Sequence, residues 1–254
     1  MTGTILAVRL PFRVAPGARQ MAADAALLEW AKGAPARLVL RSYGWSRPTL
    51  SLGRGEPFPE GWDVARLRAE GVDIARRPTG GDAVLHADEV TFAVAASLPG
   101  PWALSPRRFA DAVAEAVASA VSHAGVAAAR VGAEDADTGS PDHARVCFAR
   151  TARGEVRAGA YKIAGLASRF ARGGALCHGS LPLGEGYRDV ARYRLGGERD
   201  RALIERHARS LGELLGGPPP RGEALADAIA DALGARLGAN WERATFADLG
   251  IPEP

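Results

Sequence analysis

The amino-acid sequence predicts an α/β (α+β) fold, and two kinds of pattern carry that prediction. Short segments rich in valine, isoleucine and leucine, bounded by glycine and proline, recur through much of the chain and are typical of strands. Other segments have apolar residues at a spacing of four, which is typical of helices. Because the chain has 254 residues and 47% hydrophobic content, it can bury a large core, and we expect one domain over residues 1–254.

The first part of the chain supplies most of the expected strands. The expected strands are residues 5–10, 38–41, 49–52, 83–86 and 90–95. A helix is expected over residues 19–30. A turn through Gly44-Trp45 and Arg47-Pro48 should join the second and third strands, and the last two strands predict a hairpin.

The clearest helix comes next in the chain. It begins with Ser105 as N-cap and Pro106 at the first helical position, and it ends at Gly125. The polar residues 132–143 predict a loop, which is a candidate lid because it precedes a cysteine. Residues 185–254 show helical spacing, and we expect them to form a helical C-terminal extension packed on the domain.

Charge and terminal patterns argue against several classes of protein. The formal net charge is only +3 and the arginines are scattered, so a nucleic-acid-binding protein is not indicated. The first ten residues lack the features of a targeting segment, and no run of eighteen apolar residues occurs. We therefore expect a soluble cytoplasmic protein with no nucleic-acid partner and no membrane partner.

The cysteine and lysine content points to individual side chains. The two cysteines, Cys147 and Cys177, form no CxxC motif and no histidine pair has metal-ligand spacing, so we expect neither a disulfide framework nor a metal site. The two lysines, Lys32 and Lys162, stand among 30 arginines. Lysine is a compact donor whose pKa responds to burial, so Lys162 is a candidate for a role that arginine cannot fill. An ordinary surface lysine is the alternative.

Three segments have the composition of a site. In the segment RRPTGGDAVLH, residues 76–86, paired glycines let the backbone approach a ligand and the arginines can meet a carboxylate or phosphate. A tight turn with solvent-facing arginines explains that pattern equally well. Cys147 lies fifteen residues before Lys162, and a lysine on an adjacent strand could lower the pKa of its thiol. A buried, inert cysteine is the commoner case.

The third segment contains adjacent cysteine and histidine residues. Neighbouring residues on a strand point to opposite faces, so Cys177 and His178 are a poor catalytic pair. We interpret Cys177 as structural and His178-Gly179 as a candidate wall of a site.

Three motifs taken together resemble the catalytic domain of the lipoate–protein ligase and octanoyltransferase family. They are Arg76 to His86, Gly159 to Arg169 and His178 to Leu181, in that order. Met21 to Asp24 and Tyr43 to Arg54 are softer matches. Three separated motifs in one order are far more specific than any one of them, and the resemblance spans most of the chain.

The resemblance implies a fold and a set of site residues. The fold is a mixed, largely antiparallel central sheet flanked by helices, of the biotin/lipoate protein ligase catalytic-domain type, with a medium-length acyl chain in an apolar tunnel. Cys147 would be the nucleophile, and Lys162 would stabilise its thiolate and carry its proton. The implied substrate-binding residues are Arg76, Gly80, Gly81, His86, Gly165, His178 and Gly179.

The family divides into ATP-dependent ligases and cysteine-dependent octanoyltransferases. Asp82 stands where ligases usually have a third glycine, and its carboxylate would repel a triphosphate. Cys147 falls where the transferase branch carries its nucleophile, although Ser168 and Cys177 stand where that branch usually has glutamine. We expect an acyltransferase that needs no cofactor.

The expected donor is octanoyl-acyl carrier protein, and the expected acceptor is a lysine of a lipoyl domain or of a glycine-cleavage H protein. Three alternatives stay open. They are an ATP-dependent lipoate–protein ligase, which would use ATP and magnesium, a lipoyl amidotransferase, and a non-catalytic acyl-binding module.

Overall fold

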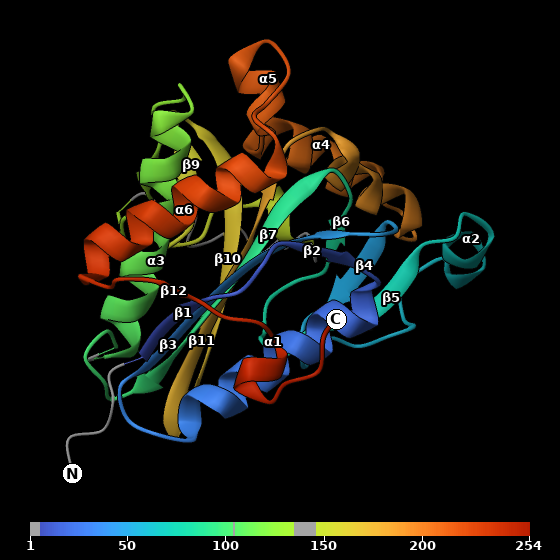
Figure 1. Cartoon of the computed structure of the whole chain (residues 1–254). Coiled ribbons are helices and arrows are strands. Elements are labelled where there is room, and N and C mark those ends of the chain that lie inside the picture. The colour runs from blue at the N-terminus through green and yellow to red at the C-terminus, as the bar shows by residue number, and fades with distance from the viewer. Residues whose placement is uncertain (1–5, 104, 135–145) are drawn as a thin grey trace.

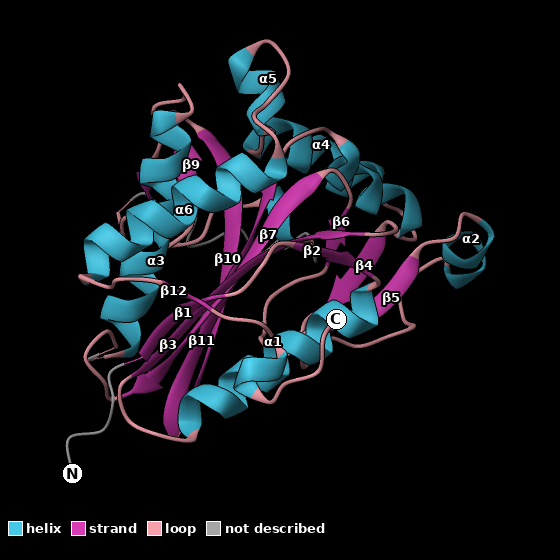
Figure 2. Cartoon of the chain, viewed as in Figure 1, coloured by secondary structure: helices cyan, strands magenta, loops and turns pink. Residues whose placement is uncertain are grey.

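A large mixed sheet runs through the middle of the protein (Figures 1 and 2). The computed structural model describes residues 6–103, 105–134 and 146–254. Over these residues the strand order is β12-β1-β3-β7-β11-β10-β9-β8, with β2 paired to β3. The strands are β1 (Leu6–Arg9), β2 (Arg13–Ala15), β3 (Arg37–Trp45), β7 (Glu89–Leu98), β8 (Ala129–Arg130), β9 (Val156–Ala158), β10 (Tyr161–Ala171), β11 (Gly173–Pro182) and β12 (Glu242–Arg243).

Antiparallel pairing dominates this sheet. Every neighbouring pair from β3 through β7, β11, β10 and β9 to β8 is antiparallel, whereas β1, β2 and β12 join through parallel pairs. The predicted mixed, largely antiparallel sheet is therefore confirmed.

A second, smaller sheet has the order β5-β4-β6. Its strands are β4 (Thr49–Leu52), β5 (Asp73–Arg76) and β6 (Val84–His86). The short helix α2 (Val64–Ala69) precedes β5. Leu50 and Leu85 lie in a core cluster beneath this sheet together with Phe148 and Tyr187. The small sheet therefore packs on a hydrophobic core of its own, separate from the cores of the large sheet.

Helices cover both faces of the large sheet (Figure 1). α1 contacts one face, and α3 and α6 contact each other and the opposite face. Alternation along β3 explains this: Val39 is buried on the α1 side, and Leu38 and Leu40 are buried on the α3 side. The helices are α1 (Gly17–Lys32), α3 (Pro106–His123), α4 (Glu198–His207), α5 (Leu211–Leu215) and α6 (Gly222–Leu237), with 3-10 turns η1 (Cys147–Ala149), η2 (Gly186–Tyr193) and η3 (Ala247–Leu249).

The structure confirms several expected elements and corrects others. The Ser105 hydroxyl accepts a hydrogen bond from the Arg108 N–H at the start of α3, as predicted. The predicted turn is confirmed at Arg47-Pro48, between β3 and β4, but its Gly44-Trp45 part is wrong, because β3 continues through both residues while β2 pairs alongside. The predicted hairpin is also wrong: β6 pairs with β4 in the small sheet and β7 enters the large one.

The C-terminal segment is not wholly helical. Residues 185–254 contain η2, α4, α5 and α6, but Glu242 and Arg243 form β12, which pairs with β1 at the sheet edge. The candidate lid at 132–143 lies outside the described residues, except for 132–134. Among the described helices, none combines the length and apolar character needed to span a membrane.

Candidate active site

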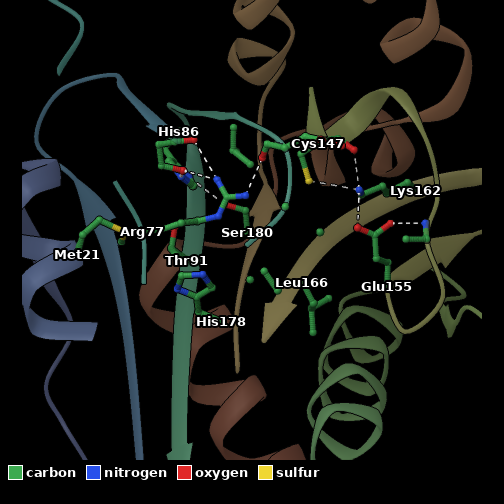
Figure 3. Close-up of a pocket in the computed structure, with 18 of the residues that line it drawn as sticks. Met21, Arg77, His86, Thr91, Cys147, Glu155, Lys162, Leu166, His178 and Ser180 are labelled. Atoms are coloured by element: carbon green, nitrogen blue, oxygen red, sulfur yellow. Dashed lines mark hydrogen bonds and ion pairs between the residues drawn. The ribbon is translucent and has the colours of Figure 1, made fainter. Parts of the chain in front are cut away.

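A cavity of about 160 Å³ lies between the large sheet and the segments that carry the small one (Figure 3). Seven of the nine residues predicted for the site line it. They are Gly81, His86, Cys147, Lys162, Gly165, His178 and Gly179. Cys147, Lys162 and Glu155 lie together on one side of the cavity, and His86 and Met21 lie on the other. Met21, Val84 and Leu166 give the wall apolar surface between these polar groups.

Cys147 begins the 3-10 turn η1 and is held by its buried neighbours. Val146 forms a bridge with Ala83, and the Cys147 N–H donates to the Ala83 carbonyl at 2.9 Å. Phe148, on the other side, is buried and its ring lies 5.0 Å from that of Tyr187. These anchors leave Cys147 half-buried in the wall of the cavity.

Lys162 reaches the cavity because β10 is irregular. Strict alternation would place Lys162 and Gly165 on opposite faces of the strand, yet both line the cavity. The β9–β10 register shifts between Lys162 and Ala164, and a bulge of this kind re-aims a side chain. The Lys162 Nζ consequently lies 3.4 Å from the Cys147 Sγ, although its side chain is only 1% exposed.

The electrostatic surroundings of these two groups oppose each other. Burial raises the pKa of the Cys147 thiol, and the Lys162 ammonium lowers it without cancelling the rise. Burial alone would lower the pKa of Lys162, but Cys147 and Glu155 raise it above its ordinary value. Both shifts act in the direction of a protonated thiol beside an ammonium.

The double-glycine loop is fixed by Arg77, which sequence reasoning did not select. The Arg77 side chain is buried and donates to the carbonyls of Ser51, Gly80 and Asp82 at 2.7–3.2 Å. Gly81 lines the cavity with a φ of +92°, a conformation that favours glycine. The arginine thus holds the loop in place, and its N–H groups are used within the protein.

Two predicted residues do not line the cavity. The Arg76 side chain turns away and donates to the carbonyls of Gly53 and Glu56. Gly80 is exposed at the turn of the loop. Arg76 is the last residue of β5, and Arg77 follows it. Neighbouring side chains on an extended chain point to opposite sides, so Arg77 rather than Arg76 meets the cavity.

His178 lines the inner wall and is held from both ring nitrogens. Its Nδ1 lies 2.9 Å from the Asp24 Oδ2, and its Nε2 lies 2.6 Å from the Thr79 hydroxyl. Burial lowers the pKa of His178, although Asp24 acts in the opposite direction. The Cys177 side chain faces the α3 core instead, as alternation on the strand predicted.

His86 is fixed in the same manner, from both of its ring nitrogens. Its Nδ1 lies 2.7 Å from the Glu89 carboxylate, and its Nε2 lies 2.7 Å from the Ser51 hydroxyl. The ring stacks on Trp45 with centroids 4.0 Å apart. Trp45 can do this because it belongs to β3 and not to a turn.

Two glycines, Gly165 on β10 and Gly179 on β11, leave room at the cavity. A Cβ at Gly165 would lie 3.0 Å from the Cys147 Sγ and 3.4 Å from the Lys162 Cε. A Cβ at Gly179 would lie 2.5 Å from the Phe92 ring. Larger residues at either position would displace the groups that form the site.

An ion pair lies at the cavity wall near Cys147. The Arg150 Nη2 lies 3.1 Å from the Asp82 Oδ2, and both side chains are partly exposed and line the cavity. Asp82 is the residue that departs from the expected glycine, and its carboxylate meets this arginine. The pair links the double-glycine loop to the segment that follows η1.

Sequence reasoning missed Glu155, which accepts a hydrogen bond from the Lys162 Nζ at 2.6 Å. In the sequence it stands in a polar segment, next to Gly154, and nothing in its spacing separates it from a surface residue. Its 5% exposure is the signal, and only the folded chain provides it.

The chain belongs to the lipoyl protein ligase A/B catalytic domain family, whose model matches residues 16–234. It is similar to an octanoyltransferase LipM of Kyrpidia tusciae, with 35% identity over 78% of this chain and 77% of that protein. An octanoyltransferase LipM of Geobacillus kaustophilus is 34% identical over 66% of this chain. That match spans 62% of the length of the Geobacillus protein.

Solved structures support the same fold. A lipoate-protein ligase A bound with ATP has a TM-score of 0.76 at 20% identity, covering 94% of this chain and 89% of that one. A bi-partite lipoate protein ligase from Thermoplasma acidophilum has a TM-score of 0.72 at 16% identity, covering 94% and 87%. At these identities the likeness concerns the fold alone.

Proposed function

We propose that this protein is an acyltransferase that moves an octanoyl or lipoyl group through a thioester on Cys147 to a lysine of a lipoyl-domain or glycine-cleavage H protein. The observation that carries the proposal is the Cys147 thiol at the cavity wall, 3.4 Å from the buried Lys162 ammonium. A thiol beside a fixed proton carrier is the arrangement that nucleophilic catalysis requires. The octanoyltransferase names of the similar curated proteins support the same chemistry.

The reaction proceeds in two exchanges at one carbonyl carbon. The Cys147 sulfur attacks the thioester carbonyl of the donor, octanoyl-acyl carrier protein, and the donor sulfur leaves with the proton lost by Cys147. The acceptor amine then attacks the cysteine thioester, and Cys147 regains a proton while the amide forms. Lys162 carries protons at the sulfur, and the backbone near Gly81 faces the developing oxyanion.

The cavity supports an acyl chain as the bound group. Met21, Val84 and Leu166 supply apolar contacts, and the nucleophile lies at the same cavity. Bound chains of this type gain affinity from apolar surface removed from water. We therefore place the chain against this wall with its carbonyl beside Cys147.

The engagement of nearby cations favours a thioester donor over ATP. Among the described residues around the cavity, Arg76 and Arg77 donate to backbone carbonyls, and Arg150 pairs with Asp82. A triphosphate needs several uncommitted donors of this kind. The engagement of these arginines supports a transfer that needs neither ATP nor magnesium.

Intact mass spectrometry tests the proposal. The purified protein is incubated with octanoyl-acyl carrier protein without ATP, and an octanoyl adduct on the wild type that is missing in Cys147→Ser is expected. Subsequent addition of a lipoyl domain should remove the adduct and octanoylate the domain. No adduct, with lipoyl adenylate formed when ATP and lipoate are supplied, would instead favour the ligase.

A further inference from the structure

A buried carboxylate lies beside the cysteine–lysine pair and is not used in the transfer described above. Glu155 precedes β9 and is 5% exposed. One carboxylate oxygen accepts from the Lys162 Nζ at 2.6 Å, and the other accepts from the Ala152 N–H at 2.7 Å. With both oxygens bound, the carboxylate is fixed in place (Figure 3).

The Lys162 ammonium has three protons and four neighbouring acceptors. They lie at 2.6 Å for Glu155, 2.8 Å for the Cys147 carbonyl, 3.3 Å for the Arg150 carbonyl and 3.4 Å for the Cys147 Sγ. The shortest contact goes to the carboxylate and the longest to the sulfur. Charge-assisted hydrogen bonds are the shorter and stronger ones. The ammonium is therefore paired with Glu155 rather than with a thiolate.

The other charges that face Cys147 do not reverse this balance. Lys162 from β10 and Glu155 from the segment before β9 cancel one another. Arg77, after β5, is cationic and acts to lower the pKa of the thiol, but less than Lys162 does, and its N–H groups donate to carbonyls; Asp82 and Arg150 pair with each other. A thiolate on Cys147 would be a second anion competing for one ammonium.

We propose that Glu155 is a positioning residue that competes with Cys147 for the Lys162 ammonium and keeps the cysteine a neutral thiol in the resting protein. The inference rests on the proposed function only in taking Cys147 as the nucleophile. During attack the thiol proton passes to Lys162 as Lys162 gives a proton to Glu155. The sulfur–carbonyl bond to Cys147 forms, the donor's sulfur–carbonyl bond breaks, and the departing thiolate takes the stored proton back through Lys162.

Alkylation of Cys147 by iodoacetamide tests the inference without any acyl donor. The rate is followed by intact mass as a function of pH in the wild type and in Glu155→Gln, which keeps the shape of the side chain and removes its charge. We expect Glu155→Gln to react roughly tenfold faster at pH 7, which corresponds to a fall of about one unit in thiol pKa. An unchanged or slower rate would overturn the inference.

Two controls isolate the effect. Cys147→Ser gives the background, because Cys177 is fully buried. Glu115→Gln removes a partly exposed carboxylate on α3 that pairs with Arg130 and Arg236, and it should leave the profile unchanged.

The wild-type profile is a second test that does not depend on the folding of any variant. The alkylation rate of the wild type should rise only at alkaline pH, with a midpoint above the ordinary thiol pKa of about 8.5. A midpoint at or below pH 7 would mean that the ammonium already pairs with a thiolate, and the inference would be wrong. Failure of octanoylation with an alkaline alkylation profile would instead count against the proposed function alone.

Discussion

Asp24→Asn should destabilise the protein severely, because it removes the charge that faces a buried arginine. Asp24 is completely buried on α1, and its Oδ1 lies 3.0 Å from the Arg41 Nε, whose side chain is 1% exposed. Its Oδ2 accepts from the Tyr43 hydroxyl at 2.9 Å and lies 2.9 Å from the His178 Nδ1. Burial would raise the pKa of Asp24, but Arg41 and His178 outweigh it and lower the pKa. The carboxylate is therefore charged at neutral pH.

The magnitude follows from leaving one member of a buried ion pair without its partner. Such a change costs about 3–5 kcal/mol, because the remaining charge stays desolvated. Asparagine keeps the shape of the side chain, so little of this loss comes from packing. For a chain of this size the melting temperature should fall by about 6–20 °C.

Urea denaturation followed by circular dichroism measures the loss. The midpoint should fall while its slope with denaturant stays constant, since the exposed surface on unfolding does not change. Glu29→Gln on the same helix removes an exposed ion pair with Lys32, and it should change stability by less than about 1 kcal/mol.

The double variant Asp24→Asn/Arg41→Gln separates unpaired charge from other effects. It should recover part of the loss, because no unpaired cation remains buried. A loss below about 1 kcal/mol in Asp24→Asn, or no recovery in the double variant, would refute the reasoning.

Three further predictions concern the cavity. Gly165→Ala places a methyl group against the Cys147 Sγ and the Lys162 side chain. Octanoylation of Cys147 should therefore slow at least tenfold, while the melting temperature falls by only a few degrees. An unaffected rate would show that the thiol and the lysine can move without cost. Asp82→Gly removes the carboxylate that engages Arg150, so calorimetric ATP affinity should rise by about 1–2 kcal/mol, and equal affinity in both proteins would contradict this account. The pKa of His178 is lowered by burial, so the unfolded chain takes up a proton at higher pH than the folded one. Stability should therefore decline as pH falls below about 6.5, and this decline should be smaller in His178→Gln when urea unfolding is compared at pH 7.5 and 5.5.

Local patterns in the sequence predicted much of the fold. The capped start of α3 and the apolar spacing of the C-terminal helices are short-range features, and the structure contains them. The pairing of strands was harder to predict. β6 and β7 are separated by two residues and resemble a hairpin, yet they enter different sheets. β6 pairs with β4, and β7 pairs with β3 and β11, and none of these partners is its neighbour in the sequence.

The candidate site divides in the same way. Motif order and the rarity of lysine pointed to Cys147 and Lys162, and the structure places their side chains in contact. Strand alternation also separated Cys177 from His178 correctly. Composition could not predict that Arg77, and not Arg76, faces the cavity. The two adjacent arginines are equivalent until the structure shows which side of β5 faces the cavity.

By itself the sequence determined the α/β class, the family motifs and the two residues at the centre of the site, because each depends on residue type, order or short spacing. The tertiary structure decided what surrounds them. The bulge in β10 turned Lys162 and Gly165 to one side, and burial placed the Glu155 carboxylate against the Lys162 ammonium. Asp24 meets His178 across 154 positions of the chain. Such contacts depend on strand register and on the exclusion of water, which exist only after the chain has folded.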